Sequence, residues 1–169
     1  MLIRPARSDE LATCSALMVA AARWVAERHP PIMWHPADLT VERLLETYRP
    51  EEFRLAFLHD RPRPVCTYVL QDEDPLFWPD ARPGEALYLH KLAAAHPASG
   101  GGLLGAVVAH ALEEVRGRGR TALRLDVLRD RAALRRLYER QGFVLWDERT
   151  VGPHVVARYQ LDPAPGATT

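Results

Sequence analysis

A glycine-rich turn between an apolar run and a helical pattern constrains the fold of this chain most. The turn covers residues 96–105 and reads His-Pro-Ala-Ser-Gly-Gly-Gly-Leu-Leu-Gly; an apolar run over 86–95 precedes it. Glycine accepts a positive φ and carries no Cβ that could block a ligand. The free N–H groups of the helix that follows would point at an anion, and the helix dipole would favour its charge. The pattern therefore predicts a phosphate-binding turn.

Apolar periodicity places this turn within a mixed order of strands and helices. Residues 11–25 carry apolar side chains at steps of three and four, which predicts a helix with one apolar face. The other predicted helices cover 41–48, start at Leu103, and follow Asp130. Period-two patterns and apolar runs predict strands over 2–4, 53–58, 65–70, 86–95, 123–127, 143–146 and 155–161. This order predicts a mixed α/β fold.

Charge and composition exclude several classes of protein. Lys+Arg and Asp+Glu number 22 each, so no overall charge attracts nucleic acid or an acidic membrane. No apolar run approaches the length of a membrane span. The cysteines, Cys14 and Cys66, each lie within an apolar pattern, and no Cys/His spacing resembles a zinc site. We expect a cytoplasmic protein with no metal, no nucleic-acid partner and no membrane partner.

Two segments resemble the GNAT superfamily of N-acetyltransferases, and the resemblance extends over nearly the whole chain. Leu92-Ala-Ala-Ala-His-Pro-Ala-Ser-Gly-Gly-Gly-Leu-Leu-Gly105 is similar to the acetyl-CoA segment of the family, a strand followed by Gln/Arg-x-x-Gly-x-Gly/Ala. Asp130-Arg-Ala-Ala-Leu-Arg-Arg-Leu-Tyr-Glu-Arg-Gln-Gly-Phe143 is similar to the family helix Asn-x-x-Ala-x-x-Leu-Tyr-x-x-x-Gly-Phe. The resemblance implies one domain over 1–161 with about seven mostly antiparallel strands and about four helices. A disordered tail would follow over 162–169.

The same resemblance implies which residues bind acetyl-CoA. The backbone of the strand would hold the pantetheine arm, and N–H groups of the turn would hold the pyrophosphate. Ser99, Leu104 and Arg131 depart from the family pattern, and Leu104 puts a side chain where Gly or Ala is usual; its helical spacing with Val108 could instead turn it into the core. The implied cofactor residues are Leu92, Ala93, Ala94, Ser99, Gly100, Gly101, Gly102, Leu103, Leu104, Gly105, Arg131, Tyr138 and Arg140.

A smaller resemblance concerns the strand before the turn. Tyr88-Leu-His-Lys-Leu-Ala93 is similar to the His-x-His-x-Leu-Ala strand of arylalkylamine N-acetyltransferases, in which two histidines relay a proton from the amine. His90 matches the second histidine and is the candidate general base. By alternation, Tyr88, His90 and Leu92 would share one face. The other interpretation of His90 is a buried histidine satisfied by a backbone carbonyl.

Tyr138 is the candidate general acid, because a phenol can protonate the less basic thiolate of coenzyme A. Its alternative role is packing against Leu134 and Leu137. The candidates for the acceptor pocket are Trp34, Asp74, Trp78 and Tyr88, since acids beside aromatic rings attract a cationic amine. Asp126 faces the same side of its strand as Arg124 and is interpreted as structural.

Three functions remain open at this point. The resemblance implies an acetyl-CoA-dependent N-acetyltransferase that acts on a primary amine of a small molecule, with peptide or protein amines as other acceptors. The departures at Ser99 and Leu104 leave open a catalytically degenerate sensor or interaction protein that binds acyl-CoA. Nucleotide binding without acyl transfer is disfavoured, because the P-loop pattern is absent and the glycine turn comes late in the chain. The exposed final strands are compatible with a homodimer.

Overall fold

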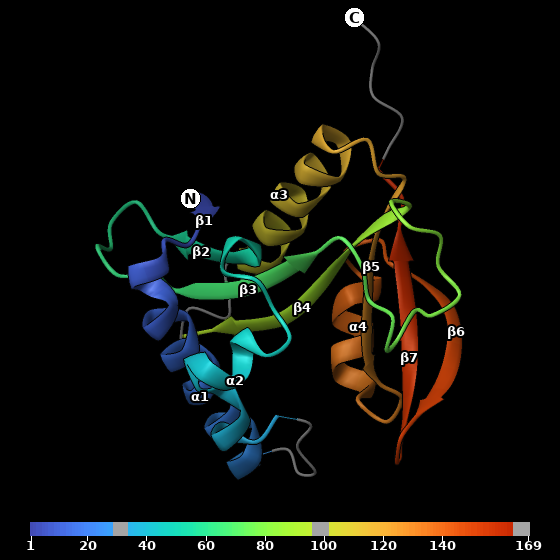
Figure 1. Ribbon diagram of the computed structural model, residues 1–169, viewed down its shortest axis with the longest axis horizontal. Coiled ribbons are helices and arrows are strands. Elements are labelled where there is room, and N and C mark those ends of the chain that lie inside the picture. Colours follow the sequence, from blue (N-terminus) through green and yellow to red (C-terminus); the bar gives the residue numbers. More distant parts are fainter. Residues whose placement is uncertain (29–33, 96–101, 164–169) are drawn as a thin grey trace, which may run out of the picture. The chain divides into compact units, whose positions relative to one another are not determined.

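The computed structural model describes residues 1–28, 34–95 and 102–163, and confirms the mixed α/β fold (Figure 1). The seven strands follow the order β1-β2-β3-β4-β5-β7-β6 in one sheet. Strands β4 and β5 pair in parallel, whereas β1–β2, β2–β3, β5–β7 and β6–β7 pair antiparallel. The elements are β1 (Leu2–Pro5), α1 (Leu11–Arg28), α2 (Val41–Leu45), β2 (Phe53–Phe57), β3 (Cys66–Gln71), β4 (Ala86–Ala94), α3 (Leu103–Gly117), β5 (Ala122–Leu128), α4 (Ala132–Glu139), β6 (Val144–Val151) and β7 (His154–Leu161).

The chain divides into two compact units. The first contains Met1–Leu70 and Lys91–Val107, and the second contains Gln71–His90 and Val108–Thr169. The predicted single domain over 1–161 stays a prediction. The tail predicted over 162–169 lies outside the described residues from 164 onwards. No helix in the described part of the chain is long and apolar enough to cross a membrane.

The first unit buries the apolar face of α1 against strands β2, β3 and β4. The predicted apolar face of α1 is almost fully buried at Leu11, Cys14 and Met18, and it continues through Ala22, whereas Ala21 and Val25 are half-buried. The buried residues share a core with residues of α2 and of the strands, among them Leu44, Phe53, Leu55, Val69 and Ala93. Burial of this stripe holds α1 on the sheet because it removes apolar surface from water.

The second unit is built around a buried arginine on β7. Arg158 is 1% exposed, and its guanidinium contacts Asp147 on β6, Asp80 in the loop after β3, and the carbonyl of Phe77. The ring of Trp78 lies 4.5 Å from the Arg158 Cζ atom. Because a buried guanidinium requires acceptors for its N–H groups, these contacts fasten the loop over residues 72–80 to β7.

Helix α4 packs against β7 in the same unit (Figure 1). The Arg135 side chain donates to the Tyr159 hydroxyl at 2.9 Å, and that hydroxyl donates to Glu139 at 2.6 Å. After α4, Gly142 adopts a φ of +93°, which favours glycine and lets the chain turn into β6. In the Tyr-x-x-x-Gly-Phe motif at the end of this helix, the glycine therefore serves the turn from α4 into β6.

The largest differences from the predictions concern the ends of α2 and β6 and the burial of one residue in α3. Helix α2 ends at Leu45 instead of Tyr48, and β6 extends to Val151 instead of Trp146 because it pairs with β7 along most of its length. In α3 the buried residues include Leu103, Val107 and Ala111, whereas Leu104 is half-buried. The expected core position of Leu104 is therefore only partly met, because the buried side of the first turn runs through Leu103.

Candidate functional site

Strand β4 carries the candidate base, and its parallel pairing with β5 stops just before that residue. The parallel register with β5 runs from Ala86↔Ala122 to Tyr88↔Arg124 and ends there. Strand β5 continues along β7 as far as Leu128↔Val156. His90 therefore follows the last parallel pair of β4 by two residues, and its imidazole lies among side chains of the second unit.

The backbone of β4 changes direction directly after His90. Lys91 has a φ of 51°, a left-handed conformation that is uncommon for residues other than glycine. A residue in this conformation interrupts the extended backbone, so the alternation predicted for Tyr88, His90 and Leu92 does not continue past His90. Within the first unit, Ala93 is buried, whereas Leu92 and Ala94 are half-buried.

His90 lies between two carboxylates of the same unit. Its Nε2 atom is 3.4 Å from Asp74 Oδ2, and its Nδ1 atom is 3.9 Å from Asp126 Oδ1. The three side chains are between 6% and 10% exposed and come from the loop after β3, from β4 and from β5. An imidazole with a carboxylate facing each nitrogen is suited to accept a proton, since both anions stabilise the imidazolium.

The Asp74 carboxylate is held by the backbone of its own loop. The Phe77 N–H donates to Asp74 Oδ1 at 3.1 Å, and the Trp78 N–H donates to the Asp74 carbonyl at 2.8 Å. Burial raises the pKa of Asp74 from its ordinary value of 3.8 to about 6, against the opposing effect of the backbone N–H groups and Arg158. The site thus contains a carboxylate that titrates close to neutral pH.

Replacing Asp74 with asparagine is expected to stabilise the fold at neutral pH. A carboxyl group whose pKa is raised on folding contributes stability below pH 4, and this is lost as the pH rises through about 6. The rise in pKa corresponds to about 3 kcal/mol as an upper value. We expect the free energy of unfolding of Asp74→Asn to exceed that of the wild type by an amount that grows as the pH rises from 4 to 8. Urea unfolding over this range measures the difference. A difference that stayed constant over this range would contradict the assigned titration.

The same three residues also lie close enough together to act as ligands of one cation. One possible ligand atom from each of Asp74, His90 and Asp126 lies within 4.8 Å of the others. The shortest distances join the two carboxylates to different ring nitrogens of His90. The cluster therefore offers two carboxylates and one imidazole to a proton or to a cation.

Aromatic rings and arginine side chains pack beside this cluster. Trp78 and Tyr88, both predicted for the acceptor pocket, are 3% and 2% exposed, and their ring centroids are 6.1 Å apart. The Arg124 Cζ atom lies 4.7 Å from the Trp78 ring, and Arg124 Nη1 donates to the Tyr88 hydroxyl at 3.4 Å. Burial raises the pKa of Tyr88. Trp34 lies in the first unit, where Lys91 Nζ is 4.9 Å from its ring.

The remaining predicted residues are spread over α3 and α4. Gly102 has a φ of +83°, consistent with a turn that needs glycine before α3. Leu103 is buried and Gly105 is half-buried, whereas Ser99, Gly100 and Gly101 lie outside the described residues. On α4, Tyr138 is 7% exposed, with its ring 5.7 Å from that of Phe143. Arg131 and Arg140 occupy the two ends of this helix.

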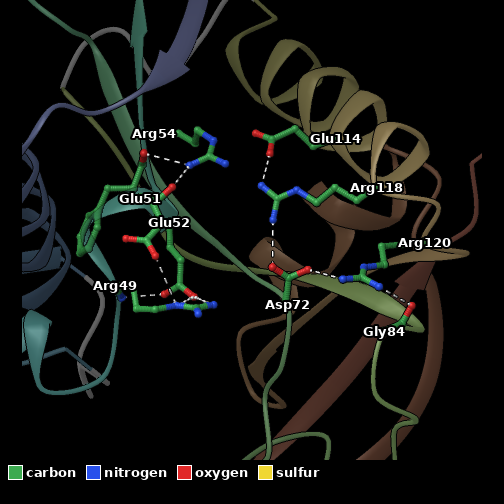
Figure 2. A network of polar contacts seen from close by, with 10 residues as sticks. Arg49, Glu51, Glu52, Arg54, Asp72, Gly84, Glu114, Arg118 and Arg120 are labelled. Carbon is green, nitrogen blue, oxygen red and sulfur yellow. Dashed lines mark hydrogen bonds and ion pairs between the residues drawn. The ribbon is translucent and has the colours of Figure 1, made fainter.

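Figure 2 shows two polar networks outside the predicted site. In the second unit, Asp72 accepts from Arg118 at 3.0 Å and from Arg120 at 2.8 Å, and Arg120 also donates to the Gly84 carbonyl. In the first unit, Arg49 pairs with Glu52, and Arg54 Nη1 donates to the Glu51 carbonyl at 2.6 Å. The Asp72 network fixes the start of the loop that carries Asp74.

Asp126 is the site residue whose contact with His90 sequence reasoning missed. Its placement on the same strand side as Arg124 is compatible with the structure, but its proximity to His90 arises because β4 and β5 are neighbours in the sheet. Alternation along β5 could have suggested an inward-facing carboxylate. It could not have shown which strand lies alongside.

Comparisons with known proteins agree with this fold. A model described as the acetyltransferase (GNAT) family matches residues 18–143, while no curated protein matches the sequence. A GNAT-family acetyltransferase structure from Listeria monocytogenes is 19% identical, with a TM-score of 0.76 over 95% of this chain and 94% of its own. A GNAT-family structure from Desulfovibrio desulfuricans is 19% identical, with a TM-score of 0.69 over 96% and 99%.

A third structure, yncA from Salmonella typhimurium, contains its cofactor acetyl-CoA. It is 15% identical to this chain, with a TM-score of 0.66 over 100% of this chain and 97% of its own. At such identities the likeness concerns the fold, whereas the family match rests on the sequence of residues 18–143.

Proposed function

This chain belongs to the acetyltransferase (GNAT) family, and on that premise we propose that it transfers the acetyl group of acetyl-CoA to a primary amine of a small molecule. The acceptor attacks the thioester directly while both substrates are bound. The C–N bond forms, the C–S bond breaks, and the ammonium proton leaves before or during attack. The observation that carries the proposal is the His90 imidazole with a carboxylate facing each ring nitrogen.

His90 acts as the general base in this proposal. An ammonium group has no lone pair, so the acceptor becomes a nucleophile only after it has lost a proton. The two carboxylates favour protonation of the imidazole and attract a cationic acceptor. Trp78 and Tyr88 are almost fully buried beside this cluster, so they offer an acceptor little surface, and Trp34 remains a candidate contact.

The coenzyme is held by β4 and by the turn before α3. The backbone of Leu92, Ala93 and Ala94 binds the pantetheine arm as a strand edge binds a peptide. The N–H groups of 100–105 bind the pyrophosphate, Ser99 offers a further donor, and the positive φ of Gly102 supports the start of α3 after this turn. Arg131 and Arg140 carry positive charge for the phosphate at the adenosine end. The yncA structure, which contains acetyl-CoA, supports this choice of cofactor.

Coenzyme A binding and thiol release test the proposed function directly. Calorimetry with coenzyme A is expected to show saturable binding. A thiol-release assay with acetyl-CoA should show turnover with primary amines and none with matched alcohols. Binding without turnover across simple amines, arylalkylamines and peptides would instead support the acyl-CoA sensor, and loss of binding would overturn both.

Replacing Tyr138 with phenylalanine is expected to lower kcat for acetyl transfer about tenfold with little change in coenzyme A affinity. The phenol would protonate the departing thiolate, which is already a fair leaving group, so the loss is moderate. Phenylalanine keeps the packing against Phe143, whose ring lies 5.7 Å away. Steady-state kinetics and calorimetry on the same preparation measure the two effects. An unchanged kcat would leave Tyr138 with its packing role alone.

A further inference from the structure

We propose that Asp74 is a positioning residue for His90, which holds the imidazole from the Nε2 side and leaves Nδ1 as the nitrogen that takes the proton from the acceptor. The inference rests on the proposed acetyl transfer, and it adds which atom reacts and which of the two carboxylates orients it. Both carboxylates lie near His90, but their surroundings differ in ways that separate their roles.

The Nε2 side of the His90 ring is closed to solvent. His90 Nε2 and the facing Asp74 Oδ2 are both buried and lie 3.4 Å apart. Because an acceptor amine or a relaying water has no access to a buried nitrogen, we assign proton transfer to the other ring nitrogen. This is Nδ1, which lies 3.9 Å from Asp126 Oδ1.

The loop holds the Asp74 carboxylate in one orientation. Oδ1 accepts the Phe77 N–H, which directs Oδ2 toward the imidazole. Arg158 donates to the Phe77 carbonyl at 3.1 Å and so fastens the same residue to β7. A carboxylate fixed in this way selects the ring orientation and stabilises positive charge on the imidazole, as outer carboxylates do for other functional histidines.

The other charged and titratable groups near the pair do not replace this effect. Arg158 on β7 acts on Asp74, and Tyr88 on β4 is close enough for Asp74 to influence its pKa. Arg124 on β5 contacts Tyr88 and Glu85. Asp74 and Asp126 each place a carboxylate oxygen within 4 Å of a ring nitrogen of His90.

Kinetics of three variants distinguish the roles of the carboxylates. Asp74→Asn keeps the acceptor for the Phe77 N–H but lacks the charge, so kcat should fall by about 10- to 100-fold with KM for the amine nearly unchanged. The acidic limb of the kcat/KM profile should move to lower pH, because the imidazolium loses a stabilising anion. Asp126→Asn should mainly raise KM for a cationic amine. Glu73→Gln removes an exposed carboxylate from the same loop and should change neither quantity.

The opposite division of effects would overturn the proposal. If Asp126→Asn lowered kcat and shifted the pH limb while Asp74→Asn only raised KM, then Nε2 would be the reacting nitrogen. An Asp74→Asn variant with wild-type kinetics would remove the positioning role. Because Asp74→Asn is expected to unfold no more easily than the wild type at neutral pH, a lower kcat would not arise from loss of folding.

An NMR titration separates this inference from the proposed function. ¹⁵N shifts of the His90 ring, assigned with the His90→Gln variant, report protonation and tautomer without any turnover. His90 should protonate at a higher pH in the wild type than in Asp74→Asn, with Nε2 carrying the proton in the neutral ring. An identical titration in both proteins would overturn the positioning role even if acetyl transfer is measured. If the titration is as expected but no acetyl transfer is measured, the interaction of Asp74 with His90 is supported and the proposed acetyl transfer is refuted.

Discussion

Replacing His90 with glutamine is expected to lower kcat for acetyl transfer by about 10²- to 10⁴-fold, the usual contribution of a positioned general base. Glutamine keeps a polar side chain of similar length beside Asp74 and Asp126 but cannot accept the acceptor's proton. Thiol-release kinetics with acetyl-CoA and a reactive primary amine measure the change. Coenzyme A affinity, measured by calorimetry, should stay at the wild-type value because the imidazole is assigned to the amine and not to the cofactor.

A second histidine offers a matched control for this experiment. His110 lies on α3, is half-buried, and has Nδ1 3.7 Å from Glu114 Oε1. His110→Gln makes the same chemical change away from the cluster and should leave kcat unchanged. The pH profile adds an independent check, because the acidic limb that reports protonation of the base should disappear in His90→Gln. Wild-type turnover in His90→Gln would remove His90 from the base role.

Replacing Arg158 with methionine is expected to lower the free energy of unfolding by about 2–4 kcal/mol at pH 7. Arg158 is 1% exposed, so its loss leaves the Phe77 carbonyl without this donor and removes the cation from the face of Trp78. The side chains of Asp80 and Asp147 are 54% and 43% exposed and regain water, which keeps the loss below that of a fully buried pair. Urea unfolding followed by tryptophan fluorescence measures the difference.

The pH dependence and a control variant test the cause of this loss. Arg158 lowers the pKa of Asp80 to about 2, so the stability from this pair is present above pH 4 and disappears as the pH falls through about 2. The difference between Arg158→Met and the wild type should therefore shrink in acid. Arg149→Met removes a half-exposed arginine 3.9 Å from Asp80 and should change stability by less than about 0.5 kcal/mol. Equal losses in the two variants would contradict the role of burial.

Local patterns predicted most of the elements because each reflects the backbone geometry of one segment. The apolar steps of α1 appear in the structure as its buried face, and the strand–turn–helix segment appears as β4, Gly102 and α3. The local pattern predicts too short a β6, because the later residues of this strand alternate in exposure and have no strongly apolar face. Pairing with β7, which no local pattern contains, extends the strand.

The candidate site was predictable in part. His90 could be selected from the chain because its strand resembles that of a known acetyltransferase branch, whereas its neighbours depend on distant segments. Asp74 lies in the loop before β4, and Asp126 lies on β5, which follows β4 only after the whole of helix α3. The pairing of β4 with β5 and the contacts of the loop with Arg158, Arg118 and Arg120 bring the two carboxylates to the imidazole.

Motifs and periodicity are properties of short segments, so they indicated the family, the order of the elements and the candidate base. The surroundings of that base come from the packing of distant segments. This packing placed a carboxylate at each ring nitrogen, buried one nitrogen together with Asp74, and raised the pKa of Asp74 to about 6. The burial of a group and its distance from other charges depend on which strands and loops become neighbours, and no short segment of the sequence specifies those neighbours.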